Sequence, residues 1–128
     1  SPAAIRRVAR FGDAWYPIGA NPEFPLNSIE RYRAAVGKLH AEAQRIGRDP
    51  KTIELALWAN WSYEGNPVQL EDGTRQLFTG GLSAVADDIA WLEEAGVRHC
   101  LFNFVRSTQS ESVAAMEAFA DAVIARRR

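Results

Sequence analysis

Residues 53–59 read Ile-Glu-Leu-Ala-Leu-Trp-Ala, a nearly continuous apolar run that ends where a polar segment begins at Asn60. Such a run is typical of a strand that is covered on both faces of a parallel sheet. Similar apolar runs occur at residues 14–18 and within residues 97–105. We therefore expect three buried strands, with Trp15 and Trp58 in the core.

Segments of helical periodicity precede, separate and follow these strands. The helices are expected at about residues 2–10, 27–46 and 82–95, and from Ser110 onward. Asn27 and Glu30 have the spacing of a capping box, and Asp87 and Asp88 resemble a solvated helix face. The face of the last helix expected to point inward comprises Val113, Met116, Ala120, Val123 and Ile124.

Strict alternation of helices and buried strands predicts an α/β fold with parallel strands joined by right-handed crossovers. A doubly wound sheet and a (β/α)8 barrel share this pattern, and three strands are too few for either. A barrel takes about 250 residues. We therefore interpret residues 1–128 as a single partial domain. Its open strand edges favour a partner, either a missing half or a second copy of the chain.

Composition and charge exclude several classes of protein. The chain has 15 Lys and Arg against 16 Asp and Glu, without the basic excess of a nucleic-acid-binding surface. Its single cysteine, Cys100, argues against a disulfide framework or a multi-cysteine metal site and is expected to be an inert buried thiol. No apolar run reaches the length of a membrane span, and without a basic segment followed by an apolar stretch at the start we expect no signal peptide. We expect a cytoplasmic protein without a metal.

Residues 1–17 read Ser-Pro-Ala-Ala-Ile-Arg-Arg-Val-Ala-Arg-Phe-Gly-Asp-Ala-Trp-Tyr-Pro. This stretch resembles a segment of the luciferase-like monooxygenase family, which contains flavin-dependent monooxygenases and deazaflavin-dependent oxidoreductases. Residues 46–55, 77–80 and 92–97 are similar to its C-terminal portion, although Ala14 replaces a common glycine and Gly81-Leu82 a common Ser-Pro. The resemblance implies the C-terminal part of a (β/α)8 TIM barrel, with strands six to eight present.

The resemblance also implies an oxidoreductase that uses FMN or a deazaflavin (coenzyme F-420) for hydride transfer or monooxygenation of a small-molecule substrate. Ser1, with the amides of Ala3 and Ala4, is then expected to help hold the cofactor phosphate at a helix N-terminus. A plain helix cap is the alternative role of Ser1. Proton-transfer residues of the family lie mostly upstream, so we expect no turnover from these 128 residues alone.

Side chains at the carboxyl ends of barrel strands face the active site. Arg75, in the long loop after the second strand, is a candidate charge for a substrate or cofactor, with a solvated loop arginine as the alternative. Asn103 is either a pocket residue or a satisfied core amide. The expected pocket residues at the strand ends are Tyr16, Asn60, Trp61, Asn103 and Arg106.

Other kinds of protein remain open at this point. The chain is alternatively a non-catalytic α/β module that dimerises through its exposed strand edges. A small flavodoxin-like domain is a weaker alternative, because two strands and a phosphate-binding loop after the first strand are lacking.

Overall fold

The computed structural model describes residues 1–62 and 65–125 and has the expected alternation of helices and strands. Each predicted element is present, with ends displaced by a few residues. Two short helical turns, η1 and η2, accompany the longer elements. In chain order they are α1 (Pro2–Phe11), β1 (Ala14–Trp15), α2 (Ile29–Arg45), η1 (Pro50–Thr52), β2 (Glu54–Ser62), α3 (Leu82–Glu94), β3 (Val97–Asn103), α4 (Gln109–Phe119) and η2 (Ala120–Ile124).

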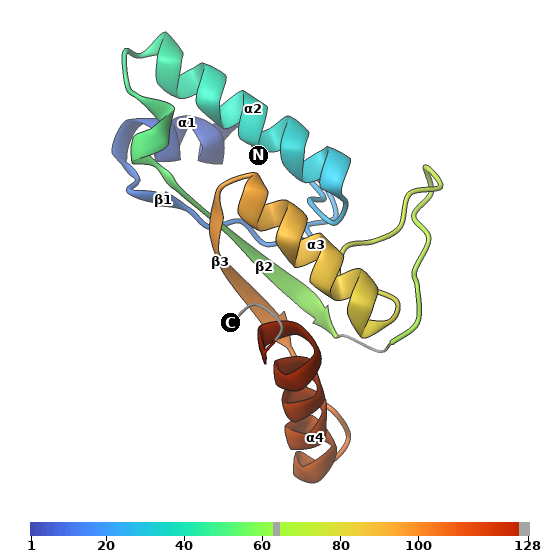
Figure 1. Ribbon diagram of the computed structural model, residues 1–128. Coiled ribbons are helices and arrows are strands. Elements are labelled where there is room, and N and C mark those ends of the chain that lie inside the picture. Colours follow the sequence, from blue (N-terminus) through green and yellow to red (C-terminus); the bar gives the residue numbers. More distant parts are fainter. Residues whose placement is uncertain (63–64, 126–128) are drawn as a thin grey trace.

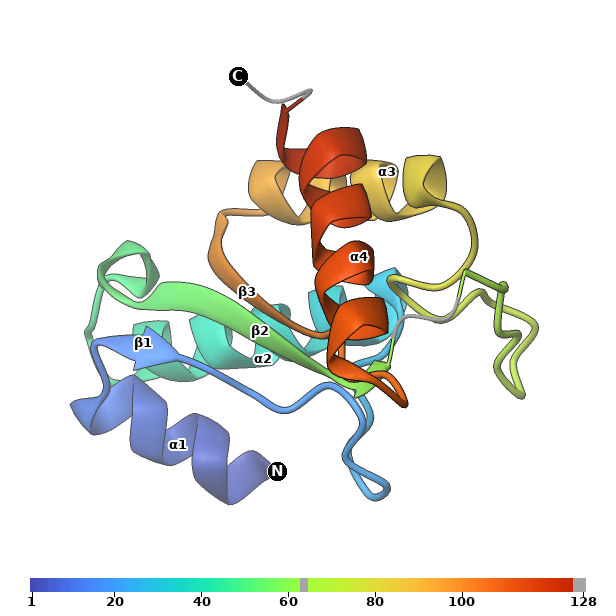
Figure 2. The same ribbon diagram turned by 90° about the horizontal axis from the view of Figure 1, so that it is seen from below.

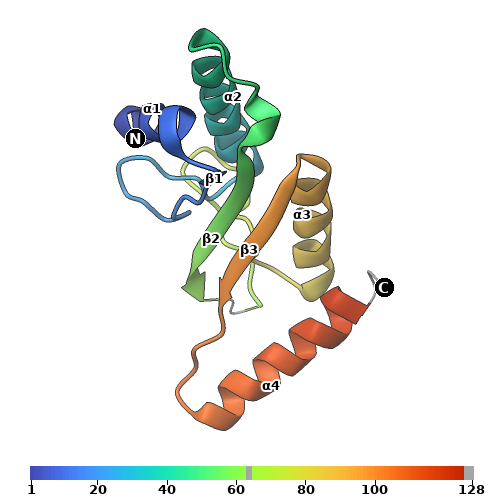
Figure 3. The same ribbon diagram turned by 90° about the vertical axis from the view of Figure 1, so that its left-hand side faces the viewer.

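The three strands form a parallel sheet in the order β1-β2-β3, as predicted. Trp15 pairs with Leu55, and Leu57 pairs with Cys100. Helices α2 and α3 lie on the same side of the sheet (Figures 1 and 3), and α1 packs against α2. Coverage of one side by every crossover helix is the arrangement of a barrel wall, whereas a doubly wound sheet has helices on both sides.

The two faces of the sheet differ in burial. On the face toward the helices, Leu55, Leu57 and Ala59 are buried. On the opposite face, which we call the open face, Trp58 is 39% exposed and Leu101 is 46% exposed. Trp15 is in the core as predicted, where it stacks on Tyr32 with ring centroids 5.5 Å apart. The prediction that Trp58 is also a core residue is wrong for this chain, because strand alternation turns its side chain away from the helices.

Serine side chains cap the first two helices. Ser1 is the N-cap of α1, and its Oγ accepts a hydrogen bond from the Ala4 amide at 3.3 Å. The capping box predicted from Asn27 is wrong, because Ser28 is the N-cap of α2 and accepts from the amide of Arg31. The side chain of Asn27 instead accepts from Nη1 of Arg31 at 2.9 Å.

The N-cap of helix α4 lies two residues before Ser110, where we expected the helix to start, and the helix packs by a different face. Thr108 is its N-cap and forms a capping box with Glu111. Phe119 and Val123 are its buried apolar side chains, the latter in η2. The predicted inward face is therefore largely wrong, since Val113, Met116 and Ile124 are 40–46% exposed. The cause is the docking of the last helical turns on α3, while the start of α4 extends away from the sheet (Figures 1 and 3).

The loop between β2 and α3 is fastened by a buried ion pair. Arg75 makes two contacts with the carboxylate of Asp88, at 2.5 and 3.0 Å, and donates to the carbonyl of Thr79 at 2.7 Å. Asp88 also accepts the amide of Phe78 at 2.8 Å and is only 2% exposed. It is therefore not part of a solvated helix face, whereas the neighbouring Asp87 is exposed.

Burial also determines the chemistry of the only cysteine. Cys100 lies in β3 and is partly buried, with its sulfur not in a disulfide. Burial raises the pKa of the Cys100 thiol to about 11. The thiol is therefore protonated and weakly nucleophilic near neutral pH, in line with the expected inert role.

We predict that Asp88→Ala lowers the free energy of unfolding by about 3 kcal/mol, because it leaves Arg75 and the Phe78 amide without their buried acceptor. Urea unfolding measures the change. The matched control is Asp87→Ala, one residue earlier on α3, which should alter stability by less than about 0.5 kcal/mol because Asp87 is exposed. Equal stability losses in the two variants would show that the ion pair does not hold the loop.

Candidate functional site

The parallel register arranges the open face in levels along the strands. Ile18 bridges to Trp58, and Trp58 pairs with Leu101, so the three side chains stand side by side. We call these three residues the apolar row, and each is 39–46% exposed. Toward the amino ends of the strands lie Glu54 and His99, whose Oε2 and Nε2 are 3.7 Å apart. The apolar row therefore separates a charged level from the carboxyl edge of the sheet.

Two carboxamides occupy the level beyond the apolar row, at the carboxyl edge. Asn60 in β2 and Asn103 in β3 follow residues of the apolar row by two positions, which places all four side chains on one face. Oδ1 of Asn60 accepts the amide of Ala20 at 2.8 Å, and Oδ1 of Asn103 accepts the amide of Val105 at 2.9 Å. Both residues are partly buried. Each side chain is thus held by its oxygen against the loop that follows a strand.

Trp61, which we expected in the pocket, points to the other side of the sheet. Its Nε1 donates to the carbonyl of Leu77 at 3.1 Å, and its ring stacks on Phe78. The indole also lies against Gly19, where an added Cβ would be 2.5 Å from the Trp61 ring. Side chains alternate along β2, so Trp61 and Asn60 lie on opposite faces of the sheet. Trp61 therefore packs on the helix side of the carboxyl edge and does not line the open face.

The remaining strand-end candidates are near the edge of the sheet. Tyr16 is 46% exposed, two residues before Ile18 of the apolar row. Arg106 follows β3, donates its backbone amide to Ser112 Oγ at 2.9 Å and is partly buried. Nη1 of Arg106 donates to the carbonyl of Val105 at 3.0 Å. The role of both side chains in a pocket stays a prediction.

Arg75 is not brought together with these residues. Its guanidinium is directed to Asp88 and to the carbonyl of Thr79, on the helix side of the sheet. The alternative of a solvated loop arginine is wrong, because the partly exposed side chain is paired with the buried carboxylate of Asp88. Its contribution of charge to a substrate stays a prediction, although these contacts occupy most of its donors.

The predicted phosphate site lies at the start of α1. Ser1 is at the N-terminus, which lies beside the loop that follows β1 (Figures 2 and 3). The amide of Ala4 donates to Ser1 Oγ, and the amide of Ile5 donates to the Ser1 carbonyl. Ser1 is therefore a helix cap in this structure. A phosphate held by Ser1, Ala3 and Ala4 stays a prediction, which the positive end of the helix dipole favours.

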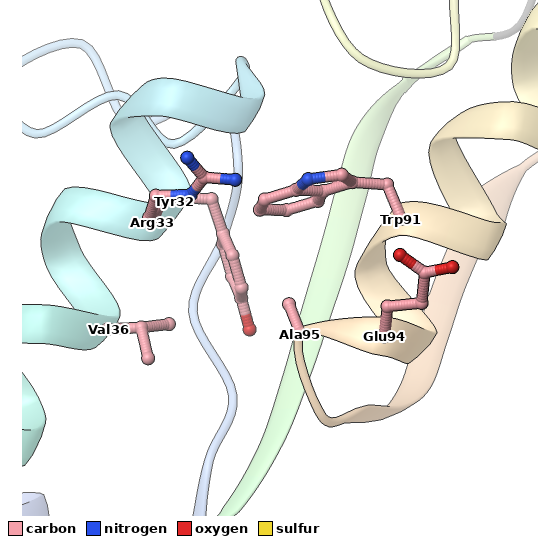
Figure 4. A pocket seen from close by; sticks show the side chains of 6 residues that line it. All are labelled: Tyr32, Arg33, Val36, Trp91, Glu94 and Ala95. Atoms are coloured by element: carbon pink, nitrogen blue, oxygen red, sulfur yellow. The ribbon is translucent and has the colours of Figure 1, made fainter.

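A separate groove of about 370 Å³ lies between α2 and α3 on the helix side of the sheet. Figure 4 shows the ring of Tyr32 at one wall and the indole of Trp91 opposite it, with the guanidinium of Arg33 5.1 Å from the centroid of the Trp91 ring. Burial raises the pKa of the Tyr32 hydroxyl, which donates to the carbonyl of Ala56 at 3.1 Å. The groove is outside the open face and was not predicted from the sequence.

The sequence analysis missed three candidate site residues, Ile18, Trp58 and Leu101. All three lie in apolar runs that we expected to form buried strands. The available signal was their position two residues before a polar strand end or turn, which puts them on the same face as the residues at the edge.

Comparison with known proteins concerns the fold. No protein-family model and no curated protein matches the sequence. Among solved structures, the coenzyme F420-dependent tetrahydromethanopterin reductase from Methanopyrus kandleri matches all of this chain with a TM-score of 0.66 and 13% identity. The chain covers 49% of that protein, and therefore spans about half its length. The expected C-terminal part of a (β/α)8 barrel, with a luciferase-like fold, is supported by this likeness.

Residues 1–62 and 65–125 contain neither a candidate membrane span nor a candidate metal site. None of the helices there combines the length and apolar character needed to cross a bilayer. No three His, Cys, Asp or Glu side chains in this part of the chain gather in a group suited to a metal ion.

We predict that Gly19→Ala destabilises the protein by about 1–3 kcal/mol, because the new methyl group would overlap the ring of Trp61. Chemical denaturation provides the measurement. Gly37→Ala in α2 is the matched control, since a Cβ at Gly37 meets nothing within 4 Å. It should raise stability by about 0.5–1 kcal/mol. If the Gly19→Ala protein is as stable as the wild type, the ring of Trp61 does not pack closely against Gly19.

Proposed function

We propose that this chain is part of a luciferase-like oxidoreductase that uses a deazaflavin, with FMN as the alternative cofactor, to act on a small-molecule substrate. The likeness of the whole chain to a coenzyme F420-dependent reductase is the observation that carries the proposal. The open face adds a physical argument, because its aromatic and aliphatic residues lie where the interior of a barrel would be.

The open face has the chemistry that a flat, largely apolar ring requires. Trp58 offers an aromatic surface at the centre of the apolar row, with Ile18 and Leu101 on either side. Contact with such side chains removes apolar ring surface from water. When bound, the deazaflavin or FMN ring accepts or supplies the hydride. The residues of this chain would bind and orient that ring and exclude water from one side of it.

The start of α1 suits the charged tail of such a cofactor. Helix N-termini attract phosphate through their amide groups and dipole, and Ser1 adds a hydroxyl there. Figure 2 shows the N-terminus beside the loop that follows β1, and the amide of Ala20 in that loop donates to Asn60. Phosphate binding at this position is part of the proposal.

We predict saturable binding of the deazaflavin cofactor to the purified chain without substrate turnover, because the family resemblance implies proton-transfer residues outside it. Cofactor fluorescence measures the titration, and FMN is titrated in parallel. Trp58→Ala should weaken binding about tenfold or more, since it removes the central ring surface. The matched control is Trp91→Ala, which removes an indole from the groove between α2 and α3, and this variant should bind the cofactor as the wild type does.

Two outcomes of this titration would contradict different parts of the prediction. The absence of saturable binding for both cofactors would remove the assignment of the open face as a cofactor site. Tight stoichiometric binding accompanied by substrate turnover would instead overturn the expected inactivity of these 128 residues.

A second candidate is a non-catalytic module that associates with another copy or with a complementary half-barrel. The exposure of the apolar row, and of Val105 at 72%, favours it, because a parallel sheet is normally covered on both faces. We predict a dimer by light scattering, converted to a monomer by Leu101→Glu. Val68→Glu, an equally exposed residue in the loop after β2, is the control. A monomeric wild-type chain at all concentrations would contradict self-association.

A further inference from the structure

Asn60 and Asn103 have an arrangement that the proposed function does not yet use. We propose that their carboxamides form a pair of N–H donors that binds the carbonyl or carboxylate oxygen of a planar ligand lying against the apolar row. The inference rests on the proposed function in treating the open face as the interior of a barrel. It adds the chemical group that this end of the site recognises.

Strand geometry brings the two amides to one place. Ala59 pairs with Phe102, both on the helix side, so the residues that follow them, Asn60 and Asn103, both turn to the open face. Asn103 pairs with Ser62 after an irregularity in the register, which places Asn103 at the end of β2, beyond the level of Asn60. The two residues therefore lie on adjacent strands near the carboxyl edge of the sheet.

Hydrogen bonds determine which end of each amide is available. A backbone N–H can only donate, so the atom that faces the Ala20 amide in Asn60, and the Val105 amide in Asn103, must be the oxygen. Each Nδ2 then points away from the loop that holds its oxygen. Among the side chains and backbone groups that the structure describes, which do not include the side chain of Ser62, neither nitrogen has a hydrogen-bond partner. The edge thus offers NH2 groups that are oriented in advance.

The surroundings favour an oxygen acceptor on a flat molecule. NH2 groups donate to carbonyl and carboxylate oxygens, and the nearby Arg106 adds positive charge at the same edge. The apolar row next to the amides provides a surface for the body of the ligand. A ring with a conjugated carbonyl edge combines these features, and it could come either from the cofactor or from a substrate.

Substitution by aspartate separates ligand binding from loop support. Asn60→Asp and Asn103→Asp retain an oxygen for the Ala20 and Val105 amides but remove the NH2 donors. Asn21→Asp is the matched control, because Oδ1 of Asn21 accepts backbone amides of Glu23 and Phe24 in an exposed loop and the same charge is added. All three variants should unfold at the same temperature as the wild type.

The probes are the deazaflavin ring, lumiflavin and methyluracil, which share a ring dicarbonyl edge. We expect each probe to shift the side-chain NH2 resonances of Asn60 and Asn103 in NMR spectra of the wild-type chain. Each of the two Asn→Asp variants should bind about tenfold more weakly, and Asn21→Asp should bind as the wild type does.

The possible results separate this inference from the proposed function. Shifts caused by methyluracil but not by the two larger rings would support the amide pair, assign it to a substrate carbonyl, and contradict the cofactor site. Binding of the larger rings without NH2 shifts, or with unchanged affinity in both aspartate variants, would overturn the inference and leave the proposed function in place. If no probe shifts the NH2 resonances, the inference is wrong.

Discussion

The buried carboxylate of Asp88 is the constraint on which the path of the chain after β2 depends. It accepts hydrogen bonds from two nitrogens of Arg75 and from the amide of Phe78. Phe78 has a φ of 58°, in the left-handed region that costs energy for a residue with a side chain. The hydrogen bond to Asp88 offsets part of that cost and holds the residue in place. A charge that is only 2% exposed is tolerated because it is fully paired.

The position of Phe78 extends this constraint to the rest of the fold. Its ring contacts Trp61 of β2 and Phe102 of β3, with the centroid of Phe102 4.7 Å away. Phe102 in turn contacts Phe119 of α4 at 4.9 Å. A chain of aromatic contacts therefore joins the loop, two strands and the last helix on one side of the sheet. The opposite side has no such layer in the described chain, which leaves the apolar row and the two carboxamides accessible.

The sequence was sufficient for the order of elements because the signals for them are local. Apolar runs and helical periodicity predicted the three strands and the four α-helices, and their alternation predicted parallel pairing. Details that depend on distant neighbours were not predictable in this way. Asp87 and Asp88 look alike in the sequence, and only the approach of Arg75 makes one of them a core residue. The buried face of α4 depends likewise on where η2 meets α3.

The candidate site was predicted only in part, because some of its features depend on local sequence and others on distant contacts. Asn60 and Asn103 could be placed at one edge, because parallel strands end on the same side of a sheet. Trp61 was placed there too, but the alternation of side chains sends adjacent residues to opposite faces, and its indole supports Gly19 and Leu77 instead. The core role assigned to Trp58 failed because hydrophobicity alone does not show whether a second layer is present.

The parallel register limits where insertions and deletions in the sequence can be tolerated. Each level of the open face is assembled from chain segments about forty residues apart, as with Ile18, Trp58 and Leu101. An insertion or deletion in a helix or loop leaves those levels aligned. A single codon gained or lost inside β2 would rotate its downstream side chains to the other face, removing the indole and the carboxamide from their places together. Length variation should therefore be confined to the connections.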